Sequence, residues 1–171
     1  MYRKSIEELK NRAVRLGAKE SKIIEVKTVK TAAWVRYKCQ FGCSGFAESL
    51  TCPPYSPTPD QTQKILNSFK KAILIHCQSG TKVDISKVVV QIEKEAFFAG
   101  YYKALGMGAG PCRLCAECNL KDGCRHREEA RPSMEACGID VFSTVRSNGF
   151  TIDTLDSDKC RASYFGIVLI E

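Results

Sequence analysis

Hydrophobic residues recur at helical spacing near the start of the chain. The repeating positions are Ile6, Leu9, Ala13 and Leu16. Ser5 and Glu8 stand at the spacing of a capping box, in which each residue satisfies a backbone N–H at the start of a helix. Gly17 follows the last apolar position, as expected just beyond a helix end. The pattern predicts a helix over residues 5–16.

Further along the chain, short apolar runs alternate irregularly with amphipathic stretches. Strands are expected over residues 23–26, 33–37, 72–76 and 164–170, and helices from Thr58 onward and over residues 86–105, 133–136 and 141–147. This irregular order predicts an α+β fold, a small sheet packed with helices. Two irregular cysteine-rich metal loops, about residues 38–58 and 108–140, are expected at one end of a single domain, residues 1–171.

Cysteine is the residue type that most changes this picture. The chain has 171 residues and ten cysteines. Residues 1–9 hold no apolar core of a signal peptide, and no apolar run is long enough to span a bilayer. A cytoplasmic protein without a membrane partner is therefore expected, and cytoplasmic thiols stay reduced. Because a chain of this length needs no disulfide to fold, the clustered cysteines indicate metal binding.

The tightest cluster is a C-x2-C-x2-C run followed by one more cysteine. It consists of Cys112, Cys115, Cys118 and Cys124. Three cysteines at this spacing suit a loop wrapped around a cubane, as in the bacterial ferredoxin run C-x2-C-x2-C-x3-C-P. Cys124 departs from that run, because five residues precede it and no proline follows it. The pattern predicts a [4Fe–4S] cluster, with zinc as the alternative metal, although structural zinc sites usually pair two separated C-x2-C knuckles.

A second set of cysteines lies earlier in the chain and ends in Pro-Pro. It consists of Cys39, Cys43 and Cys52, and it predicts a second metal site with three protein ligands. The candidates for a fourth ligand are Cys77, Cys137 and Cys160. If one of them closes the site, the site holds a second cluster or zinc. If none does, one corner stays open for water or a substrate, as in catalytic metal sites.

Basic residues gather around the later cysteine loop. They are Arg113, Lys121, Arg125, His126, Arg127 and Arg131. Such residues either raise the reduction potential of a nearby cluster or form a solvated face. The formal charge of +7 does not indicate nucleic acid as a partner, because acidic residues are interspersed throughout the chain. Of the two histidines, His76 is expected in the core or at a strand edge and His126 on the basic surface.

Four strings of the sequence carry a family resemblance. They are Cys52-Pro-Pro-Tyr55, Gly110–Cys118, Cys124-Arg-His126 and Arg131–Asp140. Together they resemble the prokaryotic predicted metal-binding proteins grouped as domain-of-unknown-function family 2284. The resemblance implies a small, stand-alone cytoplasmic protein of archaea and anaerobic bacteria, and it implies no reaction. The ligands it implies are Cys39, Cys43, Cys52, Cys112, Cys115, Cys118 and Cys124. Cys77 and Cys160 match no motif of the family, whereas Cys137 lies inside one.

Three functions fit these patterns. Seven cysteines in two loops favour an iron–sulfur protein with at least one [4Fe–4S] cluster and a second metal site, acting in redox or electron transfer with a redox partner protein. The first alternative is an enzyme that uses an open metal corner at Cys39, Cys43 and Cys52. The second is a zinc-stabilised interaction or nucleic-acid-binding module, whose partner would bind the basic face of residues 125–131. The sequence names no reaction and no oligomeric state.

Overall fold

A four-stranded antiparallel sheet forms the centre of the molecule. The structure, a computed structural model, describes residues 4–156 and 161–171. The strands are β1 (Glu20–Glu25), β2 (Lys71–Gln78), β3 (Leu105–Met107) and β4 (Ser163–Leu169), in the spatial order β1-β2-β4-β3. In this register, Ile75 of β2 pairs with Gly166 of β4. Residues 72–77 of β2 are all buried, because both faces of the sheet are covered.

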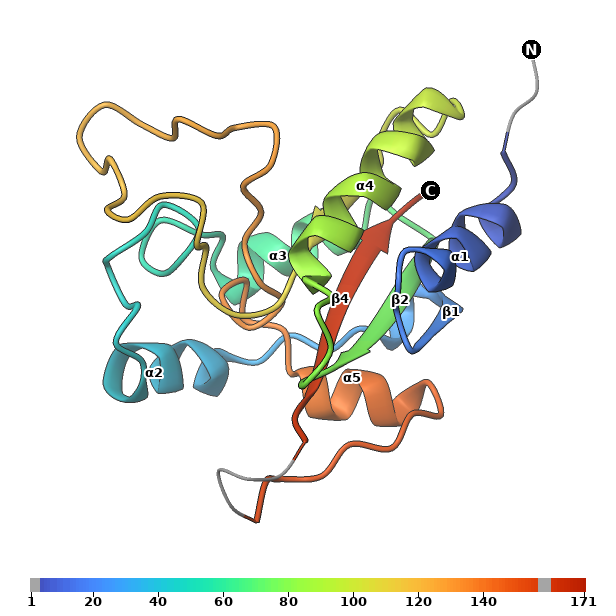
Figure 1. Cartoon of the computed structure of the whole chain (residues 1–171). Helices are drawn as coiled ribbons and strands as arrows, with labels where there is room; N and C mark the ends of the chain where they lie inside the picture. Colours follow the sequence, from blue (N-terminus) through green and yellow to red (C-terminus); the bar gives the residue numbers. More distant parts are fainter. Residues whose placement is uncertain (1–3, 157–160) are drawn as a thin grey trace.

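Helices cover the two faces of the sheet (Figure 1). The helices are α1 (Ile6–Arg15), α2 (Ala33–Gly42), α3 (Pro59–Leu66), α4 (Ile85–Phe98) and α5 (Val141–Ser147), with a short 3-10 helix, η1 (Val26–Thr28). On one face, α1 and α4 pack against Ile73 and Ile75. On the other, α3 and α5 pack with Met134 against Leu74 and Phe165. The predicted α+β class is therefore confirmed.

Local signals in the sequence start two of the helices where they were expected. The Ser5 hydroxyl accepts a hydrogen bond from the Glu8 N–H, and the Glu8 carboxylate accepts one from the Ser5 N–H. Thr58 and Gln61 form the same capping box at the start of α3. Each box satisfies backbone donors that a helix leaves unpaired. The starts of α1 and α3 are therefore determined by residues that are neighbours in the sequence.

Two predicted elements are wrong, and a third is shorter than predicted. Residues 33–37 belong to helix α2 and not to a strand. Helix α4 ends at Phe98 instead of residue 105, because Gly100 adopts a positive φ of 94° and the chain then turns to pair as β3 with β4. Residues 133–136 form no helix: Ser133 forms a parallel β-bridge with Gly108, and residues 134–138 form hydrogen-bonded turns.

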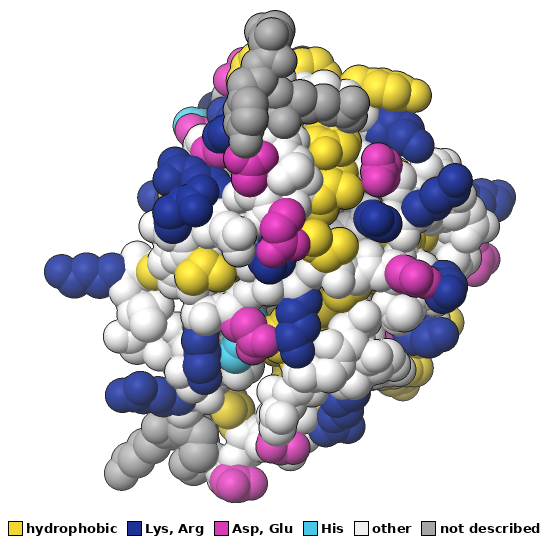
Figure 2. All heavy atoms as spheres, turned by 90° about the vertical axis from the view of Figure 1, so that its right-hand side faces the viewer, with side chains coloured by type: hydrophobic (Ala, Val, Ile, Leu, Met, Phe, Trp, Pro, Cys, Tyr) yellow, Lys and Arg dark blue, Asp and Glu magenta, His cyan; other side chains and the backbone are white. Residues whose placement is uncertain are grey.

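The cysteine segments lie together at one end of the molecule, as predicted. Figure 1 shows α2 and the long loop after β3 on the side opposite α1. The face on the α1 side carries basic side chains interspersed with acidic ones (Figure 2), so no single sign of charge dominates it. Within residues 4–156 and 161–171, no helix combines the length and the apolar character needed to cross a membrane.

Candidate metal centre

Residues 132–140, here called the central segment, hold the later cysteine loop at its neck. The Gly108 N–H donates to the Pro132 carbonyl at 2.9 Å, and the Met134 N–H donates back to the Gly108 carbonyl at 3.0 Å. The loop leaves the sheet at Gly108 and returns to it at Pro132. Its two ends are therefore fixed to one point of the fold, while the residues between them are free of regular structure.

The other side of the central segment holds the earlier cysteine set. The Ala32 N–H, at the start of α2, donates to the Gly138 carbonyl at 2.8 Å. The Ser56 hydroxyl donates to the Ala136 carbonyl at 2.6 Å, and Arg36 Nη1 donates to the same carbonyl at 3.1 Å. One buried segment therefore positions both groups of cysteines relative to each other.

Tertiary contacts explain why residues 33–37 form a helix. Arg36 Nη1 also donates to the carbonyls of Ser56 and Pro57, at 3.1 and 2.7 Å. Val35 is the buried residue of α2. These contacts fix α2 against the fold and override the strand preference of its aromatic and β-branched residues. The first cysteine loop therefore begins on a helix and not on irregular chain.

Helix α2 holds Cys39 in its last turn, and Cys43 is the residue that caps it. Cys39 lies four residues after the buried Val35 and so on the same helix face, whereas Cys43 has extended backbone and is exposed. The spacing of Val35, Cys39 and Cys43 is the signal in the sequence that could have revealed this helix.

Gly45 lies against two sulfurs of the first set, which is Cys39, Cys43 and Cys52. Its N–H donates to Cys43 Sγ at 3.4 Å. A methyl group placed on Gly45 would lie 3.6 Å from Cys43 Sγ and 3.9 Å from Cys52 Sγ, so both sulfurs face the same residue. The same point lies 3.7 Å from Cβ of Pro111, the residue before Cys112. The later loop therefore touches the first set at Pro111.

The thiols of the first set influence one another. Burial raises the pKa of the Cys52 thiol, hydrogen bonds from the Thr51 and Ser49 hydroxyls oppose the rise, and the charges of Cys43 and Cys112 add to it. Metal binding must remove these protons, because the thiolate is the ligand. We therefore infer that metal loading at this set releases protons and strengthens as the pH rises.

The second run is the group Cys112, Cys115, Cys118 and Cys124. Cys115 and Cys118 line an open hollow of about 780 Å³ together with Lys121, Arg125 and His126. Cys112 instead borders a hollow of about 930 Å³ between the start of α4 and the loop. The structure therefore does not place the four thiols of this run on one surface.

Backbone N–H groups donate to two sulfurs of the second run. The Leu50 N–H, from the first loop, donates to Cys118 Sγ at 3.5 Å. The His126 N–H donates to Cys124 Sγ at 3.4 Å. The five residues before Cys124 include a turn in which the Asp122 N–H donates to Asn119 Oδ1 at 3.0 Å. This turn accounts for the longer spacing before the last cysteine.

The other cysteines and histidines take different places. Cys77 is buried in the core beneath α1 and α4, and burial raises the pKa of its thiol to about 11. Cys137 is buried in the core on the opposite face, where burial raises its thiol pKa to about 12. Cys160 lies outside the described residues. His76 is a core residue, as predicted, and stacks on Phe165 at 4.5 Å.

Neither Cys77 nor Cys137 lines either of the two hollows. Among the residues that the structure describes, no three His, Cys, Asp or Glu side chains lie close enough together to hold a metal ion. His126 is exposed, and its Nδ1 lies 3.9 Å from Glu129. The predicted ligands are thus grouped in two neighbouring regions.

Arg131 is not part of a solvated basic face. Its guanidinium forms two bonds to Glu93 of α4, from Nε to Oε2 at 2.7 Å and from Nη2 to Oε1 at 2.9 Å. The side chains are only 18% and 12% exposed. Of the basic residues around this loop, Arg113, Lys121, Arg125 and Arg127 stay exposed. Arg131 therefore anchors the end of the loop to α4.

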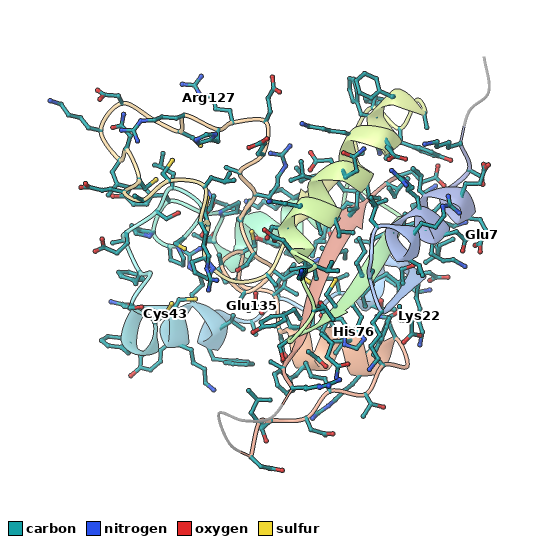
Figure 3. All side chains as sticks on the ribbon, in the orientation of Figure 1. Glu7, Lys22, Cys43, His76, Arg127 and Glu135 are labelled. Atoms are coloured by element: carbon teal, nitrogen blue, oxygen red, sulfur yellow. The ribbon has the colours of Figure 1, made fainter. Side chains whose placement is uncertain are left out.

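Glu135 of the central segment is a site residue that the sequence did not reveal. Its carboxyl lies between α2 and the sheet (Figure 3), and its Oε2 is buried without a hydrogen-bond partner. Burial raises the pKa of this carboxyl, although hydrogen bonds from its own N–H and from the Ser133 hydroxyl act to lower it. The pKa of the Cys39 thiol is raised first by burial, then by the charge of Cys43, and also by the charge of Glu135. A carboxyl whose Oε2 has no hydrogen-bond partner thus lies near Cys39 of the first set.

Glu135→Gln is expected to stabilise the metal-free protein at neutral pH. A raised carboxyl pKa means that the folded state loses stability as pH rises through it, and a neutral amide carries no such loss. The melting temperature should rise by about 2–4 °C for each kcal/mol gained. The gain should vanish below pH 4.5, the ordinary carboxyl value, where both side chains are neutral. Thermal melting at both pH values checks this. The exposed Glu128→Gln is the control, and an equal gain there would contradict the explanation.

The comparisons with known proteins identify a family. The comparison with curated proteins and the comparison with solved structures each find no match. A family model described as predicted metal-binding protein (DUF2284) matches residues 22–170. The match includes α2, both cysteine groups and the central segment. The chain therefore belongs to the DUF2284 family of predicted metal-binding proteins.

Proposed function

We propose that this protein is a cytoplasmic iron–sulfur protein with at least one [4Fe–4S] cluster and a second metal site, and that it acts in redox or electron transfer. The observation that carries the proposal is that backbone N–H groups donate to the sulfurs of three candidate ligands. These sulfurs belong to Cys43, Cys118 and Cys124. Thiolates accept such bonds, and hydrogen bonds to the sulfurs help to set a cluster's reduction potential.

The donor set also fits the soft metals. Thiolate ligands favour zinc, copper(I) and iron–sulfur clusters over the hard cations. When bound, a [4Fe–4S] cluster supplies a redox centre. The chain supplies the thiolates, the N–H donors and the positive charge of Lys121 and Arg125 at the hollow. Positive charge near a cluster favours its reduced form, which is more negative. Because the hollow is open to solvent, a redox partner protein could approach the cluster there.

Zinc is the metal that competes with this proposal. It would use the same thiolates but would add no redox chemistry. The two metals differ in the acid-labile sulfide that accompanies iron in a cluster. The chemical content of the protein therefore separates the two functions without knowledge of a substrate.

Anaerobic purification of the full chain tests the proposal. Iron and acid-labile sulfide are expected in equal amounts, together with a visible absorption that bleaches when dithionite reduces the protein. Metal analysis, sulfide analysis and absorption spectroscopy measure these quantities on one sample. Stoichiometric zinc without iron or sulfide would show that the protein is a zinc module instead.

A further inference from the structure

We propose that Cys112 is the fourth ligand of the first set and is separate from the three cysteines that follow it. The last three cysteines of the second run are Cys115, Cys118 and Cys124. They would then form a site of their own with one position that no cysteine of the run fills. The inference rests on the proposed function, because it assigns the ligands of those metal sites.

The contact at Gly45 brings Cys112 to the first set. Pro111 packs on the same side of Gly45 as the sulfurs of Cys43 and Cys52. The next residue along the chain is Cys112, so its thiol starts from a backbone already beside two of the three sulfurs. A methyl group on Gly45 would be in van der Waals contact with both sulfurs and with Pro111, so the three groups surround one point.

The two hollows separate Cys112 from Cys115 and Cys118. Cys112 borders the hollow at the start of α4, whereas Cys115 and Cys118 line the hollow that holds Arg125 and His126. Leu114 lines both hollows and marks the point where the loop passes from one to the other. Cys112 and Cys115 are three residues apart in an irregular loop, and they border different hollows.

Cys43 and Cys52 approach one point at Gly45, and Cys112 follows the Pro111 that packs there. Together with Cys39 they would supply the four thiolates of a closed site.

Two ligands of the remaining site, Cys115 and Cys118, line a basic hollow. Lys121, Arg125 and His126 line this hollow, opposed by the single carboxylate of Glu117. Positive charge at an open metal position favours an anionic ligand over a neutral one. The open corner that the sequence assigned to the first set thus moves to Cys115, Cys118 and Cys124.

Serine variants of the full chain test the assignment. The triple variant Cys115→Ser/Cys118→Ser/Cys124→Ser is expected to keep about half of the wild-type iron and sulfide, held by the first set and Cys112. Adding Cys112→Ser should remove most of what remains. Adding Cys77→Ser instead should leave it in place, because Cys77 is a core residue. Equal iron in the triple variant and in the triple variant with Cys112→Ser would overturn the assignment. Wild-type protein without iron would refute the proposed function itself.

Crosslinking of the metal-free full chain gives a second test that does not depend on a cluster. Dibromobimane becomes fluorescent when it joins two neighbouring thiols. A variant that keeps Cys52 and Cys112 as its only loop cysteines is expected to react faster than one that keeps Cys112 and Cys118. Circular dichroism confirms that both variants are folded. Faster reaction of the Cys112–Cys118 pair would contradict the assignment.

Discussion

Cys52→Ser is expected to remove the metal bound by the first set, while Cys77→Ala leaves the metal content unchanged. Both cysteines are buried, which makes them a matched pair. Cys52 lies 3.9 Å from the point on Gly45 that also faces Cys43, in the loop that meets Pro111. Cys77 lies among apolar side chains of the core under α4, where a thiol behaves as a small hydrophobic group.

The quantity to measure is metal per chain after anaerobic purification. Cys52→Ser should lose the first-set metal and keep that of the other region. Cys77→Ala should keep both and lose only stability, by about 1 kcal/mol for one small buried group. Full metal in Cys52→Ser together with loss in Cys77→Ala would show that the thiols of the core, and not those of the loops, bind the metal.

Arg131→Ala is expected to cost about 2–3 kcal/mol of unfolding free energy, because it leaves the Glu93 carboxylate largely buried without its cation. The lost contacts are two bonds to Glu93, at 2.7 and 2.9 Å, and a bond from Nη1 to the Ala130 carbonyl at 2.8 Å. Glu93 Oε2 also accepts the Gly106 N–H at 3.1 Å, so the pair joins α4, β3 and the end of the cysteine loop.

Urea denaturation of the metal-free protein measures this cost. Arg127→Ala is the control, because Arg127 lies exposed in the same loop and should change the free energy by less than about 0.5 kcal/mol. The double variant Glu93→Gln/Arg131→Ala should lose less than the sum of the single variants, since no unpaired charge remains. Equal midpoints for Arg131→Ala and Arg127→Ala would mean that the ion pair does not anchor the loop.

The predictable parts of the fold are those with strong local signals. The capping boxes at Ser5 and Thr58 start α1 and α3 where they were expected. The apolar run at residues 72–76 lies within β2, and the C-terminal run forms β4. Each of these signals lies within a few residues of sequence, so no distant contact is needed to read it.

The errors arise where distant contacts decide. Trp34 and Tyr37 favour a strand locally, but Arg36 binds carbonyls of residues far along the chain and fixes a helix. The apolar residues after Phe97 suggest a longer α4, yet Phe98 and Tyr102 are 80% and 78% exposed, so no buried stripe continues there.

The candidate site was predictable in its residue types but not in its grouping. Cysteine spacing predicts that the thiols bind metal, but it treats Cys112 and Cys115 alike, although they border different hollows. The approach of Pro111 to Gly45 joins segments far apart in the sequence, and no local pattern reveals it. Glu135 was missed because burial, and not the residue type, makes its carboxyl unusual.

Anomalous X-ray scattering from anaerobically grown crystals, recorded at the iron and zinc absorption edges, tests the central proposal most directly. The proposal of an iron–sulfur protein with two cysteine-ligated metal sites predicts strong iron-edge peaks beside both cysteine groups, one near Cys43 and Cys52 and one near Cys118. Peaks at the zinc edge in these places, without iron, would contradict it.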